Sequence, residues 1–118
     1  MAARTTEPEY DFDSWSEEDE AKAIEALKPD VRYIIVEESF VGRFPDGAIV
    51  KMPLEVSLDD VDALEGLPPV DQFKTLLGRI GGDEATAEFT RHSLAETAVM
   101  AEKFFRVFSR IAKASLPE

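Results

Sequence analysis

FVGRFPDGAIVKMP, residues 40–53, carries the clearest structural signal in this chain. Pro45 fixes φ near −65° and Gly47 tolerates a positive φ, a combination that indicates a type I turn with a G1 bulge. Apolar residues lie on both sides of the turn. The stretch therefore predicts a β-hairpin whose second strand runs over 48–52 and ends at Pro53.

The residues before this hairpin predict one more strand segment and one helix. Residues 31–40 are rich in Val, Ile and Tyr, which favours a strand buried on both sides that continues or restarts over 41–44. Ser16, followed by acidic residues, is a good helix N-cap. We expect a short helix from there to about Lys28, before Pro29. Its expected buried face consists of Ala23, Ile24 and Leu27.

Residues 1–15 show neither a helical nor a strand period and predict a flexible acidic arm. Tyr10, Phe12 and Trp15 stand out in it, because disordered tails seldom carry so many large rings. Two interpretations stay open: a loosely packed tail, or an arm that docks on a groove of its own domain or of a neighbour. Residues 16–118 are expected to form a single domain.

Four helices are expected after the hairpin, each bounded by capping residues, prolines or glycines. A hairpin followed by about four helices predicts a helix-dominated α+β fold, with the short N-terminal helix and the arm in front of it. The expected ranges of the four helices are 57–66, 68–82, 83–91 and 93 onward.

The last helix is the most unusual of them. Ser93 and Glu96 predict a capping box at its start, and its apolar residues cover about half of the helix circumference, whereas a peripheral helix needs a stripe little wider than 100°. Such a helix is wedged between elements of its own domain or shared with another chain. The candidate protein-contact residues are Phe104, Phe105, Phe108 and Ile111, with Trp15 of the arm. Core packing is the competing interpretation.

Composition excludes several functional classes. The 118 residues include no cysteine, so disulfides, thiol catalysis and Cys-ligated zinc are excluded. The net charge of −12 disfavours binding to nucleic acid or an anionic membrane. No apolar run is long enough for a membrane span, and the N-terminus does not resemble a signal peptide. A soluble cytoplasmic protein is expected.

The acidity is concentrated in the first half of the chain. Residues 1–30 contain 10 acidic and 3 basic groups, whereas residues 67–118 contain 7 of each. The acidic half is either a solvated surface or a patch for a basic partner. Basic residues on the polar face of the last helix complement its dipole or contact the acidic half of a neighbouring copy, and a homo-oligomer is expected.

The sequence shows no catalytic or metal-binding constellation. His92 lacks a second His or a Cys at ligand spacing, so a loop or capping role is expected. The acidic clusters match no calcium loop, and the glycines at 78, 81 and 82 form no dinucleotide-binding fingerprint. We predict a protein that is not an enzyme and has no catalytic residues, metal or cofactor.

Residues 40–116 resemble the tail assembly chaperones of long-tailed bacteriophages (siphophages), particularly those of actinobacterial phages and prophages. The resemblance lies in an ordered series of segments rather than in one motif. The series is FVGRFPDGAIVKMP, SLDDVDALEG, VDQFKTLLG, DEATAEF and SLAETAVMAEKFFRVF.

This resemblance implies a non-enzymatic chaperone that binds and protects the tape-measure protein and helps to recruit tail-tube subunits. It also implies self-association, a longer frameshifted form, and residence in the host cytoplasm but not in the mature virion. The competing hypothesis, from the charge alone, is an acidic adaptor or DNA-mimic inhibitor that occupies a basic nucleic-acid-binding protein.

Overall fold

The protein combines a small sheet with several helices in a mixed α and β arrangement. The computed structural model describes residues 10–115, so residues 1–9 of the expected arm lie outside the described part. The elements are α1 (Glu17–Leu27), β1 (Arg32–Val36), β2 (Ser39–Arg43), β3 (Ile49–Pro53), α2 (Leu58–Asp62), α3 (Pro69–Leu76), the π-helical segment η2 (Leu77–Gly81), α4 (Asp83–Thr90) and α5 (Leu94–Ser115).

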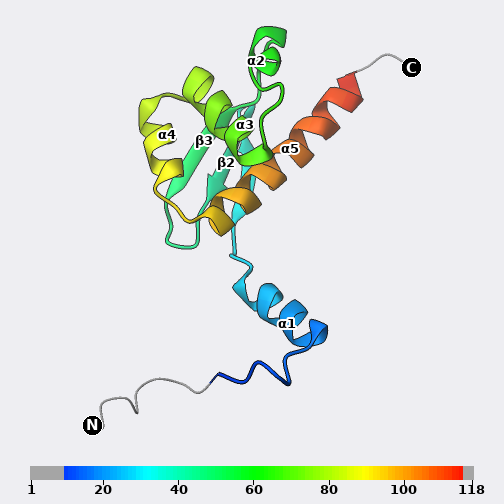
Figure 1. The fold of residues 1–118 in the computed structure, drawn as a ribbon. Coiled ribbons are helices and arrows are strands. Elements are labelled where there is room, and N and C mark those ends of the chain that lie inside the picture. Colours follow the sequence, from blue (N-terminus) through cyan, green and yellow to red (C-terminus); the bar gives the residue numbers. More distant parts are fainter. Residues whose placement is uncertain (1–9, 116–118) are drawn as a thin grey trace.

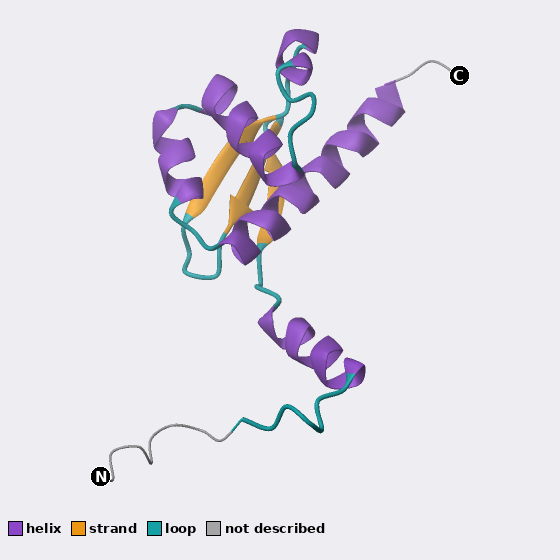
Figure 2. Ribbon diagram, in the orientation of Figure 1, coloured by secondary structure: helices purple, strands orange, loops and turns teal. Residues whose placement is uncertain are grey.

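The three strands form an antiparallel sheet in the order β1-β2-β3. Tyr33 pairs with Gly42, and Val41 lies between Ile34 and Lys51. Helices α3 and α5 cover one face of the sheet and α4 lies beside β3, while the opposite face carries none of these helices (Figure 1, Figure 2). The sheet is therefore half-covered.

The predicted hairpin at residues 40–53 is confirmed. The Phe44 N–H donates to the Ala48 carbonyl at 2.9 Å, and the Gly47 N–H donates to the Phe44 carbonyl at the same distance. Gly47 has a φ of 95°, which a residue without a Cβ adopts with no steric penalty. The turn chemistry read from the sequence is the turn that forms.

The strand predicted before this hairpin forms as β1, but its predicted extent to residue 40 and its predicted burial on both sides are wrong. The chain reverses at Glu37 and Glu38, whose φ angles of 49° and 65° are those of a two-residue turn with both central residues left-handed. Such turns normally use Asn or Gly, so two glutamates gave no turn signal. The strand is also exposed, since Ile34 and Ile35 keep 61% and 53% of their surface accessible.

The core is built on edge-to-face phenylalanine rings. The Phe104 ring centroid lies 5.3 Å from that of Phe40 and 5.2 Å from that of Phe73, an arrangement that adds to simple burial. Helix α5 packs closely on β2 at Gly42, where an added Cβ would lie 2.6 Å from Met100 Cε and would displace the end of that side chain. The apolar face of α5 is thus matched to the sheet residue by residue.

The predicted helix starts at Ser57 and at the proline pair before α3 are confirmed. The helix expected over 57–66 is shorter than predicted, since α2 ends at Asp62, and two further details differ. The helix over 69–81 is α-helical only to Leu76 and then becomes η2, which Gly82 ends with a φ of 99°. At the start of α5, Ser93 Oγ accepts from the Glu96 N–H, while the Glu96 side chain binds His92 instead of completing the capping box.

Helix α1 forms as predicted, but its predicted buried face is wrong. Ser16 and Asp19 make a complete capping box, yet none of the α1 residues is buried, and Ile24 and Leu27 are 61% and 76% exposed. The helix stands away from the body (Figure 1). The radius of gyration is accordingly 18.9 Å, compared with about 13 Å for a compact chain of this length. In the described part, no helix could cross a membrane.

Candidate protein-binding surfaces

The predicted contact residues of α5 divide between core and surface. Phe104 is fully buried, so it stabilises the fold and presents nothing to a partner. Phe105 and Phe108 are half-buried on the adjacent side of the helix, and Ile111, one turn further on, is 38% exposed. Trp15 lies far from them in the sequence, on the segment before α1, and is 57% exposed.

A first groove runs between α2 and α5, with a volume of about 370 Å³. Phe105 packs edge-on against Phe104, and Phe108 stacks parallel to Phe104 with its centroid at 6.0 Å. Each ring therefore has a fixed orientation. The lining residues are Val61, Asp62, Leu64, Glu65, Gln72, Phe105 and Phe108.

The α2 wall of this groove is held in place by polar contacts. Asp60 accepts from the backbone N–H of Ser57 at 3.1 Å and from Arg79 Nε at 2.9 Å. These bonds, the Ser57 backbone bond first, hold the pKa of Asp60 below its ordinary value. Gln72 Nε2 also donates to the Leu64 carbonyl. The groove is preformed by bonds within the chain.

A second groove lies between β1 and the C-terminal part of α5, with a volume of about 450 Å³. Its apolar lining comes mainly from Tyr33, Ile35, Val107 and Ile111. The C-terminal half of α5 extends beyond the sheet (Figure 1). The wide apolar stripe read from the sequence therefore serves the core on one side and two surface grooves on the others.

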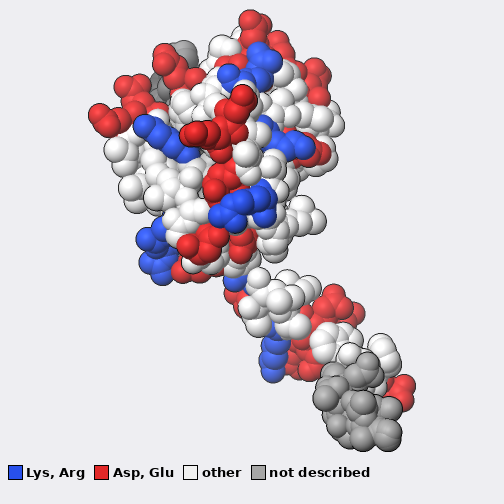
Figure 3. All heavy atoms as spheres, turned by 90° about the vertical axis from the view of Figure 1, so that its left-hand side faces the viewer, with Lys and Arg blue, Asp and Glu red and all other residues white. Residues whose placement is uncertain are grey.

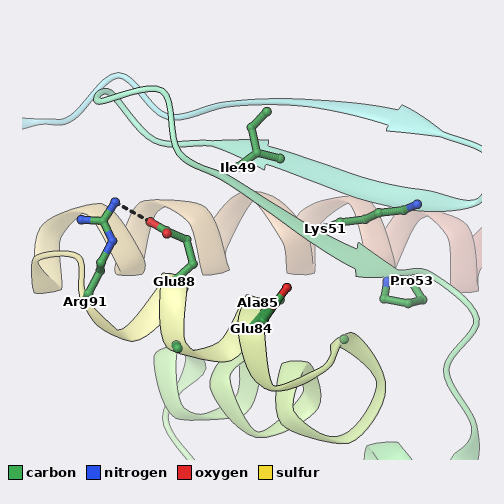
Figure 4. A pocket seen from close by; sticks show the side chains of 9 residues that line it. Ile49, Lys51, Pro53, Glu84, Ala85, Glu88 and Arg91 are labelled. Atoms are coloured by element: carbon green, nitrogen blue, oxygen red, sulfur yellow. Dashed lines mark ion pairs between the residues drawn. The ribbon is translucent and has the colours of Figure 1, made fainter.

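A third groove, about 710 Å³, lies between β3 and α4 (Figure 4). Ile49, Lys51 and Pro53 form one wall, and Glu88 and Arg91 project from the other. Arg91 Nη2 lies 2.6 Å from Glu88 Oε2, and the same nitrogen lies 3.3 Å from Asp46 Oδ2 in the hairpin turn. These charges pair with one another and tie the hairpin to α4.

His92 lies in the loop between α4 and α5, as expected, and its buried ring joins three elements. Its ring stacks on Phe44 with centroids 3.6 Å apart, and its side chain is only 4% exposed. Nε2 lies 2.8 Å from Glu88 and Nδ1 lies 2.8 Å from Glu96. Both nitrogens are occupied by carboxylates. Among the described residues no group of three or more potential ligands could hold a metal ion.

Sequence reasoning missed the uncovered face of the sheet, because it predicted burial on both sides of the first strand. A shallow groove of about 300 Å³ crosses this face, lined by Arg32, Tyr33, Ile34, Val41, Arg43 and Ile49. The sequence signal for an exposed face was weak, because Arg32 is the one charged residue of the strand and the four residues after it are aromatic or aliphatic. On the face shown in Figure 3, acidic and basic groups intermix over the body, whereas the sequence of α1 contains five acidic residues and one basic residue.

Comparisons with known proteins give no relative from which a site could be transferred. No protein-family model matches this chain, and no curated protein or solved structure is significantly similar to it.

Proposed function

We propose that this protein is a tail assembly chaperone of a long-tailed bacteriophage, a non-enzymatic protein that binds the helical tape-measure protein and helps to recruit tail-tube subunits. The observation that carries the proposal is the division of the α5 face. Phe104 completes the core, while Phe105 and Phe108 remain at the surface in a preformed groove.

The geometry suits capture of an amphipathic helix. Such helices bind by laying apolar side chains, spaced three and four residues apart, into an apolar groove. The two grooves flank the C-terminal part of α5 and together present rings and aliphatic side chains over several turns. Half-buried rings are already ordered, so binding loses little side-chain entropy.

Recruitment of tail-tube subunits, and a longer frameshifted form, are parts of the proposal supported by the ordered series of sequence segments alone. The charge of −12 agrees with a chaperone role, because mutual repulsion opposes aggregation of chains that expose apolar grooves.

Co-expression with the tape-measure protein encoded beside this gene, followed by affinity capture, tests the proposal. We expect a complex with the unmodified chain and a loss of about tenfold or more with Phe108→Ser. Leu58→Ser is the matched control, because Leu58 is 75% exposed on α2 and does not line the groove. Unfolding curves establish that both variants fold. Failure of the unmodified chain to capture the tape-measure protein overturns the proposal.

A second candidate, an acidic adaptor or DNA-mimic inhibitor, is favoured by α1 alone. Its first turn exposes Glu17, Glu18, Asp19 and Glu20 away from the body. This function predicts capture of a basic nucleic-acid-binding protein, lost steeply as salt is raised. Reversal of the α1 charges abolishes that capture, whereas Phe108→Ser leaves it unchanged.

A further inference from the structure

The uncovered face of the sheet is basic in an acidic protein. Residues 31–66 contain only three basic residues, Arg32, Arg43 and Lys51. In the strand register, Arg32 of β1 lies opposite Arg43 of β2, and Lys51 of β3 lies opposite Val41 of β2. Side chains alternate between the faces of a sheet, and Phe40 and Gly42 face the helices. All three basic residues therefore lie on the strand positions that face away from the helical layer.

The same face is also apolar. Ile34 and Ile49 are 61% and 58% exposed and line the shallow groove together with Val41. None of the outward-facing strand positions is acidic. Antiparallel sheets commonly leave one face to water, but that face is then mainly polar. An apolar surface flanked by arginines instead suits a ligand that is both apolar and acidic.

Residues 10–27 of this chain have that chemistry. They hold no buried side chain. Tyr10, Phe12 and Trp15 surround a hollow of about 460 Å³ with Asp11, and they are 70%, 84% and 57% exposed. The first turn of α1 then adds four consecutive acidic residues, and its second half exposes Ile24 and Leu27.

The connection to the body directs this segment away from its own sheet. Only residues 28–31 separate α1 from β1. Lys28 has an extended backbone, with φ −64° and ψ 120°, as expected for a residue before proline. Val31, at the other end, is fixed in the core with 2% exposure. Figure 1 shows the result, with α1 leading outward below the sheet. A short connection of this kind favours exchange between chains over folding back.

We propose that residues 10–27 of one copy pack on the uncovered sheet face of a second copy, in a reciprocal dimer. The aromatic side chains of the segment cover Ile34, Val41 and Ile49, and its acidic residues meet Arg43, whereas Arg32 Nε already lies 3.2 Å from Asp30 Oδ1 of its own chain. Each copy supplies one segment and one face, which satisfies a two-fold axis. The inference rests on these charges and exposures and not on the proposed chaperone function.

Sedimentation of the full chain over a range of concentrations tests the dimer. We expect reversible dimerisation that weakens as salt is raised and falls about tenfold or more with Arg43→Glu or Trp15→Ala. Arg106→Glu is the matched control, because Arg106 is an exposed arginine on α5 outside the sheet face. It leaves dimerisation unchanged. A chain that stays monomeric at all concentrations, or a dimer insensitive to both test variants, overturns the proposal.

Mixing the two defective variants distinguishes exchange from folding back. The Trp15→Ala chain keeps an intact face, and the Arg43→Glu chain keeps an intact segment. We expect the mixture to form a heterodimer through the one intact interface, at a concentration where each variant alone is monomeric. If the segment instead occupies its own sheet, the unmodified chain is a compact monomer in small-angle scattering, and the mixture forms no complex. The dimer proposal is also overturned if the unmodified chain stays monomeric and is retained on DNA through Arg43. These readouts are independent of tape-measure capture.

Discussion

Helices α5 and α1 both begin at a serine cap and both carry an apolar stripe, yet α5 is central to the core and α1 has no buried residue. The difference lies in the complementary surface. Gly42 makes room on β2 for α5, and Phe40 and Phe73 receive Phe104. No described element offers such a surface to Ile24 and Leu27. Local pattern decides where a helix forms, and tertiary complementarity decides whether it is buried.

The largest expected effect separates these two helices directly. Phe104→Ala removes a fully buried ring that packs against four other phenylalanine rings and should lower the free energy of unfolding by about 3–5 kcal/mol. Ile24→Ala in α1 should change it by less than about 0.5 kcal/mol. Urea unfolding at a concentration where the chain is monomeric measures both. A large loss from Ile24→Ala would mean that α1 packs on the body.

The next effect concerns the turn between β1 and β2. Replacing Glu37 and Glu38 by Asn and Gly should stabilise the body by about 1–2 kcal/mol, because both positions have left-handed backbones that disfavour a Cβ. The control, Glu37→Gln with Glu38→Gln, removes the charges but keeps both side chains and should have little effect. A stabilisation by the control of the same size would assign the gain to charge repulsion instead.

This turn was not predicted from the sequence, whereas other local elements were. The hairpin at Pro45 and Gly47, and the helix starts at Ser16 and Ser57, were predicted correctly because each depends on a few neighbouring residues with known backbone preferences. The turn at Glu37 was missed because its conformation is imposed by the pairing of β1 with β2. Tertiary packing overrode local preference there.

The candidate surfaces follow the same division. The breadth of the α5 stripe indicated that its rings serve two purposes, but only the packing of α3 and the sheet assigns Phe104 to the core and leaves Phe105 and Phe108 at the groove. The basic sheet face needed the strand register, because Arg32 and Arg43 are distant in sequence and become neighbours only across the ladder.

A smaller, pH-dependent effect is expected where the hairpin meets α4. The hydrogen bonds from His92 and then from Arg91 hold the pKa of Glu88 below its ordinary value. A carboxyl with a lowered folded-state pKa contributes stability above its unfolded pKa, near 4.3, and loses that contribution as the pH falls through the folded value. Glu88→Gln should therefore flatten the decline in stability below about pH 5.

Thermal unfolding of both proteins between neutral and acidic pH measures this effect. Glu25→Gln is the control, because Glu25 is an exposed carboxylate of α1, away from the hairpin and α4. It should leave the acid decline unchanged. If Glu88→Gln and the unmodified chain lose stability in parallel below pH 5, the His92 contact does not link protonation to folding.

Ser16→Ala should have the smallest effect on the free energy of global unfolding. Comparison with Ser57→Ala tests how α1, which stands away from the body, differs from α2, which is joined to it. Ser16 with Asp19 and Ser57 with Asp60 form the same capping box, each with a backbone bond of 3.1 Å in both directions. Loss of either box weakens its helix by about 1 kcal/mol. Helix α2 is joined to the body through Asp60 and Arg79.

Ser57→Ala should therefore lower the free energy of global unfolding, whereas Ser16→Ala should leave it unchanged. In α1 the loss stays local, because an isolated helix of 11 residues is marginal in water. Amide hydrogen exchange at low concentration should show faster exchange across 17–27 and unchanged exchange in β2. If Ser16→Ala also accelerates exchange in β2, α1 and the sheet unfold together, and the independence of the two regions is wrong.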